Sequence, residues 1–128
     1  MLVLGACGDD DTASTPSAAD LDGRNFEAFE IEGYEIVEGS NVFLTFVEGD
    51  IVVNAGCNTQ RASYSVDGDG TLEVGEMAAT LMACDDELMA QDELVVAIVS
   101  DSPTLSLEEN TLTVDGGDDA VMRLAARA

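Results

Sequence analysis

The chain of 128 residues contains no histidine, no lysine and no tryptophan. The missing histidine removes the commonest general base and the commonest transition-metal ligand in proteins. Cys–His pairs, Ser–His–Asp triads and zinc sites with histidine ligands therefore cannot be built from this chain. We expect it to have no metal site and no cofactor, and we do not expect an enzyme.

Positive charge is also scarce. Against 27 acidic residues stand four basic ones, all of them arginine, and the formal net charge is −23. Because proteins bind phosphate backbones through Lys and Arg, this composition excludes nucleic acid as a partner. The acids are scattered along the chain, which favours a solvated surface or adaptation to salt; a cation-binding surface is the alternative interpretation.

The length fits one domain, and the hydrophobic content of 46% is high enough for a folded core. A chain of this size can bury about two thirds of the surface that its unfolded form exposes. We therefore expect a single domain, and we expect it to be a monomer.

The first residues are apolar and end in Leu4-Gly5-Ala6-Cys7, which an acidic stretch follows at once. This run is too short to span a bilayer and matches the end of a secretory signal. Its last four residues resemble the lipobox of bacterial lipoproteins. We expect residues 1–7 to be a signal remnant with lipid on Cys7, and residues 8–20 to be a flexible acidic tether. The protein would then be exported and held on the outer face of a bacterial membrane. A buried N-terminal strand with an incidental cysteine is the alternative.

From Leu21 onward, short runs with a period of two alternate with Gly, Asp and Asn, which is typical of strands and turns. The predicted strands are Asn25–Ile31, Tyr34–Val37, Asn41–Val47, Asp50–Asn54, Ala62–Val66, Thr71–Val74, Thr104–Glu108, Thr111–Val114 and Ala120–Leu124. Such a series predicts an α+β fold, mostly antiparallel β, with a small curled sheet or open barrel and one helix.

The helix is predicted from Asp85 to about Ser100, a segment that begins with acids and contains neither Gly nor Pro. Its apolar stripe, expected to pack on the sheet, consists of Leu88, Val95, Ile98 and Val99. The polar residues expected to lie mostly away from that stripe are Asp86, Glu87, Gln91 and Glu93.

Two blocks of the chain contain cysteine: Ala55-Gly56-Cys57-Asn58-Thr59 followed by Ser63-Tyr64, and Met77-Ala78-Ala79-Thr80-Leu81-Met82-Ala83-Cys84. Together they resemble the META (HslJ-like) domain of bacterial envelope lipoproteins. The opening Leu21-Asp22-Gly23 also matches, whereas Ala62 stands where the family often has Gly. The resemblance implies a META domain over residues 21–128, a small mixed barrel, and no established catalytic activity. The family is associated with stress tolerance, motility and virulence.

Cys57 and Cys84 are candidates for a disulfide or for a reactive thiol. In an exported protein two cysteines more often form a disulfide than remain reduced. Two buried thiols are the alternative. A catalytic thiol is a weaker possibility, because only Arg61 is close enough in sequence to favour a thiolate.

Three residues are candidate ligand-binding positions: Asn58, Arg61 and Tyr64. Asn58 more often holds a turn, and an aromatic in an alternating strand, such as Tyr64, is more often packing. The segment Asp67–Thr71 resembles the start of a calcium loop, but its glycine is misplaced and the twelfth position is Ala78. We therefore expect a hairpin turn there.

These features predict a non-enzymatic envelope lipoprotein that supports envelope integrity or stress tolerance. It would contact the membrane through Cys7 and bind an unidentified envelope protein or small ligand. An envelope enzyme that uses a thiol or carboxylates is the rival hypothesis, and a cation-binding module is a third.

Overall fold

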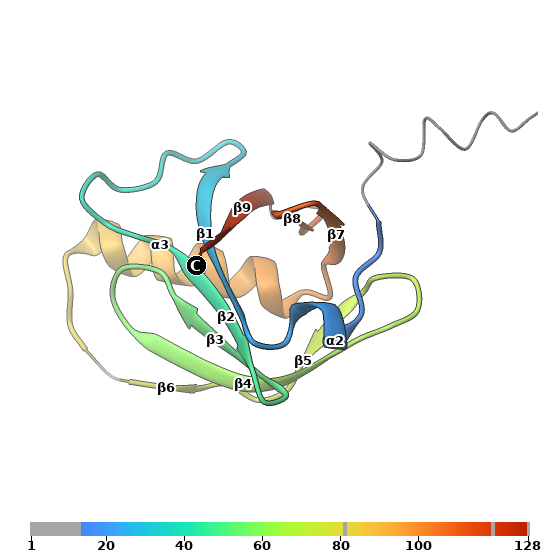
Figure 1. The fold of residues 1–128 in the computed structure, drawn as a ribbon. Coiled ribbons are helices and arrows are strands. Elements are labelled where there is room, and N and C mark those ends of the chain that lie inside the picture. The colour runs from blue at the N-terminus through green and yellow to red at the C-terminus, as the bar shows by residue number, and fades with distance from the viewer. Residues whose placement is uncertain (1–13, 81, 119, 128) are drawn as a thin grey trace, which may run out of the picture.

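The computed structural model describes residues 14–80, 82–118 and 120–127. The elements in chain order are α2 (Ala18–Leu21), β1 (Arg24–Ile31), β2 (Phe43–Val47), β3 (Asp50–Asn54), β4 (Thr59–Val66), β5 (Leu72–Val74), β6 (Ala78–Ala79), α3 (Asp86–Ser100), β7 (Thr104–Glu108), β8 (Thr111–Asp115) and β9 (Val121–Arg127). Figure 1 shows the strands curving around a common centre, with α3 packed across one side. None of the helices in these ranges has the length and apolar character needed to cross a membrane.

The strands form one antiparallel sheet in the order β5-β4-β3-β2-β1-β9-β8-β7, and β6 pairs with β4. The first and last strands of this order, β5 and β7, are also joined to each other by hydrogen bonds. The amide of Leu72 donates to the carbonyl of Pro103 at 2.8 Å, and the amide of Leu105 donates to the carbonyl of Gly70 at 2.8 Å. The sheet therefore curls into a nearly closed barrel, which confirms the predicted α+β, mostly antiparallel class.

The core is built by the period-two alternation that the sequence shows. On β2, Leu44 and Phe46 are fully buried, and on β3 Ile51 and Val53 are buried in the same alternating way. Each such side chain stabilises the fold by about 1.5–3 kcal/mol relative to an exposed one. Phe46 also contacts the ring of Phe26 edge to face, with centroids 6.0 Å apart. The predicted alternation thus specifies the inner face of the barrel.

The predicted strand Tyr34–Val37 is wrong. Tyr34 makes only an isolated bridge with Ile31, and residues 32–42 form the connection between β1 and β2. The amide of Val37 donates to the side chain of Gln91 on α3 instead of to a neighbouring strand. Alternation over four residues was therefore not sufficient for a strand, because no strand partner lies beside it. The short elements α2 and β6 were not expected from the sequence.

The last part of the predicted tether, residues 14–20, contacts the barrel. The amide and carbonyl of Ser14 pair with Leu107 on β7, at 2.8 and 2.7 Å. Ser17 caps α2 by a reciprocal pair of hydrogen bonds with Asp20, so two groups at the helix start are satisfied. Cys7 and the rest of the predicted tether and signal remnant lie outside the described residues.

The helix α3 buries Val95, Ile98 and Val99 as predicted, but its stripe also contains Gln91 and Asp92. The assignment of Gln91 to the outer face was wrong. From Leu88, steps of three and four residues reach 91 and 92 before 95, so the buried stripe is continuous along the helix. Gln91 is fully buried, and its amide is therefore a structural group that needs hydrogen-bond partners.

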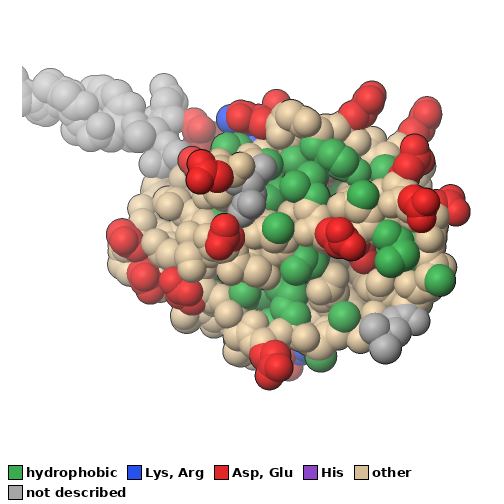
Figure 2. Space-filling model, turned by 180° about the vertical axis from the view of Figure 1, so that it is seen from behind, with side chains coloured by type: hydrophobic (Ala, Val, Ile, Leu, Met, Phe, Trp, Pro, Cys, Tyr) green, Lys and Arg blue, Asp and Glu red, His purple; other side chains and the backbone are tan. Residues whose placement is uncertain are grey.

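The barrel surface is strongly acidic, and few of its acids are paired. Arg61 pairs with Asp50 and Arg127 with Glu27, each between neighbouring strands, and Arg123 on β9 pairs with Glu30 on β1 and with Glu32 just after it. Figure 2 shows acidic side chains spread over the whole visible face. Exposed pairs of this kind contribute only about 0–1 kcal/mol each. The unpaired acids therefore leave a net repulsion in the folded state.

Raising NaCl from low concentration to 1 M is expected to raise the melting temperature, because screening shortens the reach of this repulsion from about 10 Å at 0.1 M to about 3 Å at 1 M. Mild acidification is expected to act at first in the same direction, since protonation removes like charges. Thermal unfolding followed by circular dichroism measures both effects. A melting temperature that does not change with salt would contradict this account. A rise at micromolar calcium would indicate a specific cation site.

Candidate functional site

The connection between β3 and β4 approaches α3 closely, and Gly56 permits that approach. Its φ is +106°, in the region that favours glycine, and a Cβ atom there would lie 3.1 Å from Leu88 and 3.2 Å from the amide nitrogen of Gln91. A larger residue would push the connection away from the helix. The glycine therefore places the next two residues, Cys57 and Asn58, against the start of α3.

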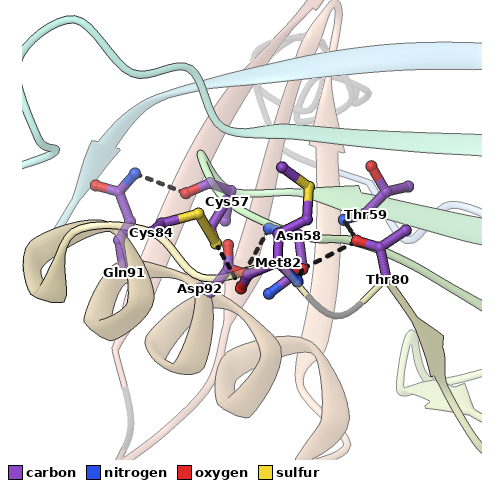
Figure 3. The surroundings of a disulfide bond; sticks show 9 residues. Cys57, Asn58, Thr59, Thr80, Met82, Cys84, Gln91 and Asp92 are labelled. Atoms are coloured by element: carbon purple, nitrogen blue, oxygen red, sulfur yellow. Dashed lines mark hydrogen bonds between the residues drawn. A yellow bond between two sulfur atoms is a disulfide. The ribbon is translucent and has the colours of Figure 1, made fainter.

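Cys57 and Cys84 form a disulfide, with Cα atoms 6.0 Å apart and a sequence separation of 27. The predicted proximity of the two cysteines is confirmed. Both are half-buried, and Cys84 comes directly before Asp85, the N-cap residue of α3. The bond thus clamps the β3–β4 connection to the beginning of the helix (Figure 3).

Asn58 holds a neighbouring segment, not only its own turn. Its side-chain oxygen accepts from the hydroxyl of Thr80 at 3.0 Å and from the amide of Met82 at 2.7 Å. The Thr80 hydroxyl oxygen in turn accepts from the amide of Thr59 at 3.0 Å. Together with the disulfide, these bonds hold Thr80 and residues 82–84 beside the first residues of β4 (Figure 3). The favoured structural interpretation of Asn58 is in line with these contacts, although its partners lie in another segment.

The buried side chain of Gln91 on α3 forms hydrogen bonds with the segments on both sides of it. Its side-chain oxygen accepts from the amide of Val37 at 2.8 Å and from the hydroxyl of Tyr34 at 3.3 Å. Its side-chain nitrogen donates to the carbonyl of Ala55 at 2.8 Å and to the hydroxyl of Ser40 at 3.0 Å. All four hydrogen-bonding positions of the amide are therefore occupied. One buried side chain ties α3 to the β1–β2 connection and to the end of β3.

Beside this clamp lies a groove with a volume of about 410 Å³ between α3 and the start of β4. Asn58 and Gln60 form one wall, and the other consists of Met89, Asp92, Glu93, Val96 and Ala97. Asp92 is only 5% exposed. One of its carboxylate oxygens accepts a hydrogen bond from the amide of Asn58 at 2.8 Å. The other oxygen is buried but has no hydrogen-bond partner among the described residues. Apolar walls with a few polar groups are typical of small-molecule sites.

Of the three predicted ligand-binding candidates, only Asn58 lies at this groove. Arg61 and Tyr64 occupy opposite faces of β4, since one is at an exposed position and the other at an inward one. Arg61 is paired with Asp50 at 2.8 Å, on the outside of the sheet. Gln91 and Asp92 were not among the site residues predicted from the sequence. Their position in the helical stripe that continues from Leu88 was the signal that could have identified them.

Tyr64 packs inside the barrel, with its ring edge to face against Phe46 at 5.1 Å. Its hydroxyl donates to the carbonyl of Ala18 at 3.3 Å and lies 3.4 Å from a carboxylate oxygen of Asp22. Burial first, and then the charge and hydrogen bond of Asp22, raise the pKa of Tyr64 to about 12 from its ordinary value of 10.0. The folded state therefore favours the neutral phenol, and Tyr64 links the sheet to α2.

Because the folded pKa lies above the unfolded one, the stability that Tyr64 contributes is complete below pH 10 and is lost as the pH rises toward 12. The chain has two tyrosines, so each Tyr→Phe variant leaves one to be titrated by tyrosinate absorbance. In Tyr34→Phe we expect the remaining tyrosine to ionise near pH 12. The melting temperature of Tyr64→Phe should also fall less than that of the natural chain between about pH 10 and pH 12. A Tyr64 midpoint near 10 would contradict the structure's account of its surroundings.

The segment Asp67–Thr71 forms the turn between β4 and β5, as predicted. The amide of Gly70 donates to the carbonyl of Asp67 at 3.0 Å, and the carboxylate of Asp69 accepts from the hydroxyl of Thr71 at 3.0 Å. These bonds occupy oxygens that a calcium loop would use for the ion. Within the described ranges, no three His, Cys, Asp or Glu residues are grouped so that they could hold a metal ion.

The fold and this site define a small antiparallel barrel domain that is clamped to its helix by one disulfide. A family model of the META domain matches residues 19–128, and the chain belongs to the META-domain family. It is therefore a bacterial envelope-type protein, of a family whose specific role is not defined.

Two solved structures share the fold. The NMR structure of a protein from Burkholderia xenovorans is 14% identical, covers 87% of this chain and 86% of its own, and has a TM-score of 0.75. A second NMR structure of a protein is 18% identical, with coverage of 86% and 94% and a TM-score of 0.72. At these identities the likeness concerns the fold alone. Comparison with curated proteins finds no match.

Proposed function

We propose that this chain is a non-enzymatic lipoprotein of the bacterial cell envelope whose META domain supports envelope integrity or stress tolerance by binding a small ligand. The observation that carries the proposal is the groove of about 410 Å³ beside α3. The disulfide and the contacts of Asn58 and Gln91 hold its two walls rigidly together, and a preformed site binds without a large ordering cost.

The anchoring part of the proposal is supported by Leu4-Gly5-Ala6-Cys7 and by the polar stretch that follows. An acyl chain contributes about 0.8 kcal/mol per buried CH₂, and two or more chains give lasting attachment. Cys7→Ser in the full-length precursor is expected to release soluble protein or to block processing. Membrane fractionation measures this, and an unchanged membrane fraction would contradict the anchor.

The enzyme rival is weakened by the state of its candidate nucleophiles. A thiolate is the reactive form of cysteine, and Cys57 and Cys84 are both consumed by their disulfide. Thiol-dependent catalysis at either residue would first need reduction. A thiol titration of the untreated protein is expected to find neither Cys57 nor Cys84 free, and a reactive thiol at either position would favour the enzyme instead.

The groove is tested in cells with a matched pair of variants. Ala97 lines the groove, whereas Ala90 lies two helical turns earlier on the same helix and lines a different hollow. Ala97→Trp is expected to fill the groove and to lose the ability to restore envelope-stress survival to a strain that lacks the protein. Ala90→Trp is expected to restore it. If Ala97→Trp restores survival as well as the natural chain, with both variants present at equal levels, binding in this groove is not the function.

A further inference from the structure

We infer that the groove beside α3 binds a small organic cation, a primary ammonium on a short apolar body. This inference deepens the proposed function and rests on the groove being the binding site. It rests on one buried hydrogen-bond acceptor without a donor among the described residues, on the apolar side chains around it, and on the net charge of the whole chain.

The acceptor is the carboxylate of Asp92. Its residue is 5% exposed, one oxygen accepts from the amide of Asn58, and the other is buried without a hydrogen-bond partner among the described residues. Buried polar atoms in folded proteins nearly always have partners, and an unpartnered carboxylate oxygen is especially costly. The paired arginines Arg61, Arg123 and Arg127 are held by other carboxylates. A carboxylate oxygen accepts hydrogen bonds, so a donor complements the unpartnered oxygen of Asp92, and a positively charged donor suits it best.

The side chains beside Asp92 suit an apolar body. Met89, Val96 and Ala97 line the groove on the same helix, and Met89 lies three residues before Asp92, one turn away on the same face. Met89 is 37% exposed, unbranched and adaptable, so a change of its rotamer can widen the groove beside Asp92 for a ligand. Figure 2 shows hydrophobic side chains gathered in patches between the acids on this side of the molecule. An ammonium at Asp92 would leave its hydrocarbon part against Met89 and Val96.

The net charge of the whole chain favours a cationic ligand over an anionic one. A net charge of −23 concentrates cations near the surface and repels anions, and Glu93 adds a further carboxylate at the groove. The larger hollow of about 650 Å³ near Tyr34 is also acidic, through Glu35, Glu38 and Glu87. The buried acceptor near that hollow is the side-chain oxygen of Gln91, which already accepts hydrogen bonds from Tyr34 and Val37 and so has no free position for a ligand. The groove at Asp92 is thus the better cation site.

The inference is tested on the full chain, with its disulfide intact, by titration at constant ionic strength with 2-phenylethylammonium. The matched probes are neutral 2-phenylethanol and anionic 3-phenylpropanoate. NMR is expected to show saturable shifts of the amides of Asn58, Met89, Asp92 and Ala97 with the ammonium. The neutral and anionic probes are expected to bind at least ~10-fold more weakly, because they lack the charged donor. Equal binding of the alcohol, or shifts spread over the acidic surface without saturation, would overturn the inference.

Asp92→Asn retains an oxygen for the Asn58 amide but removes the charge, and is expected to weaken ammonium binding at least ~10-fold. Glu108→Gln also replaces a carboxylate by an amide, at an exposed position on β7 that does not line the groove, and is expected to change ammonium binding less than ~3-fold. Binding to Asp92→Asn that equals the natural chain's would overturn the inference. If Asp92→Asn does not fold, Ala97→Trp provides the second test. Because its side chain fills the groove, it must abolish the saturable amide shifts caused by 2-phenylethylammonium. Failure of the ammonium to bind, with Ala97→Trp still inactive in cells, would overturn the ligand class and leave the proposed function standing.

Discussion

Replacing Cys57 and Cys84 together with serine is expected to lower the free energy of unfolding by about 3.5 kcal/mol. The disulfide closes a loop of 27 residues, and its loss restores the corresponding chain entropy to the unfolded state. For a domain of this size the melting temperature should fall by roughly 10–20 °C. Urea unfolding of the variant and of the natural chain gives the difference directly, and reduction of the natural chain should reproduce it.

The same variant has a local signature. Without the disulfide, residues 75–80 and 82–84 are held by the two-residue strand β6 and by the bonds of Asn58. The amides of Thr80 and Met82 should therefore exchange with solvent before those of the barrel do. Cys7→Ser removes a cysteine outside the described residues and should leave both the stability and the exchange unchanged. A double variant within about 1 kcal/mol of the natural chain would show that this clamp is not a main source of stability.

Gln91→Ala is expected to destabilise the fold by about 3–4 kcal/mol. The substitution leaves the amide of Val37 and the carbonyl of Ala55 without their partner, and each unsatisfied buried group costs about 1–3 kcal/mol. It also opens a cavity between α3 and the end of β3. Gln91→Glu keeps the shape but places an oxygen against the carbonyl of Ala55, so it should destabilise nearly as much. Chemical denaturation measures both.

Gln60→Ala is the matched control. Gln60 is half-buried at the groove, and its side chain makes no hydrogen bond to the described residues, so its removal should cost less than about 1 kcal/mol. Similar decreases in the free energy of unfolding for Gln91→Ala and Gln60→Ala would show that the hydrogen bonds of Gln91 do not stabilise the fold. If hydrogen exchange in Gln91→Ala shows lost protection only at residues 34–40, the role of Gln91 is limited to anchoring the β1–β2 connection.

Most of the strands could be predicted because their signal is local. Alternation on Phe43–Val47 and Asp50–Asn54, separated by Glu48 and Gly49, requires only neighbouring residues to be read together. Tyr34–Val37 has a similar pattern but lies in a connection, because whether such a run becomes a strand depends on a partner strand elsewhere in the chain.

The candidate site was predictable only in part. The pairing of Cys57 with Cys84 followed from their number and from the expected compartment. The groove did not, because Asn58 and Asp92 are 34 residues apart and meet only when α3 packs on the barrel. Arg61 and Tyr64 looked equally suitable in sequence, but the alternation of β4 turns them to opposite faces.

By itself, the sequence determined the acidic surface, the absence of histidine chemistry, the mostly antiparallel class and the proximity of Cys57 and Cys84. These depend on composition, on local periodicity and on short motifs. Only the tertiary structure decided that the sheet closes between Leu72 and Pro103, that Gln91 is buried and satisfied, and that Asp92 is buried with one oxygen unpartnered among the described residues. The physical reason is that hydrogen-bond satisfaction belongs to groups brought together from distant segments, and no local pattern contains that information.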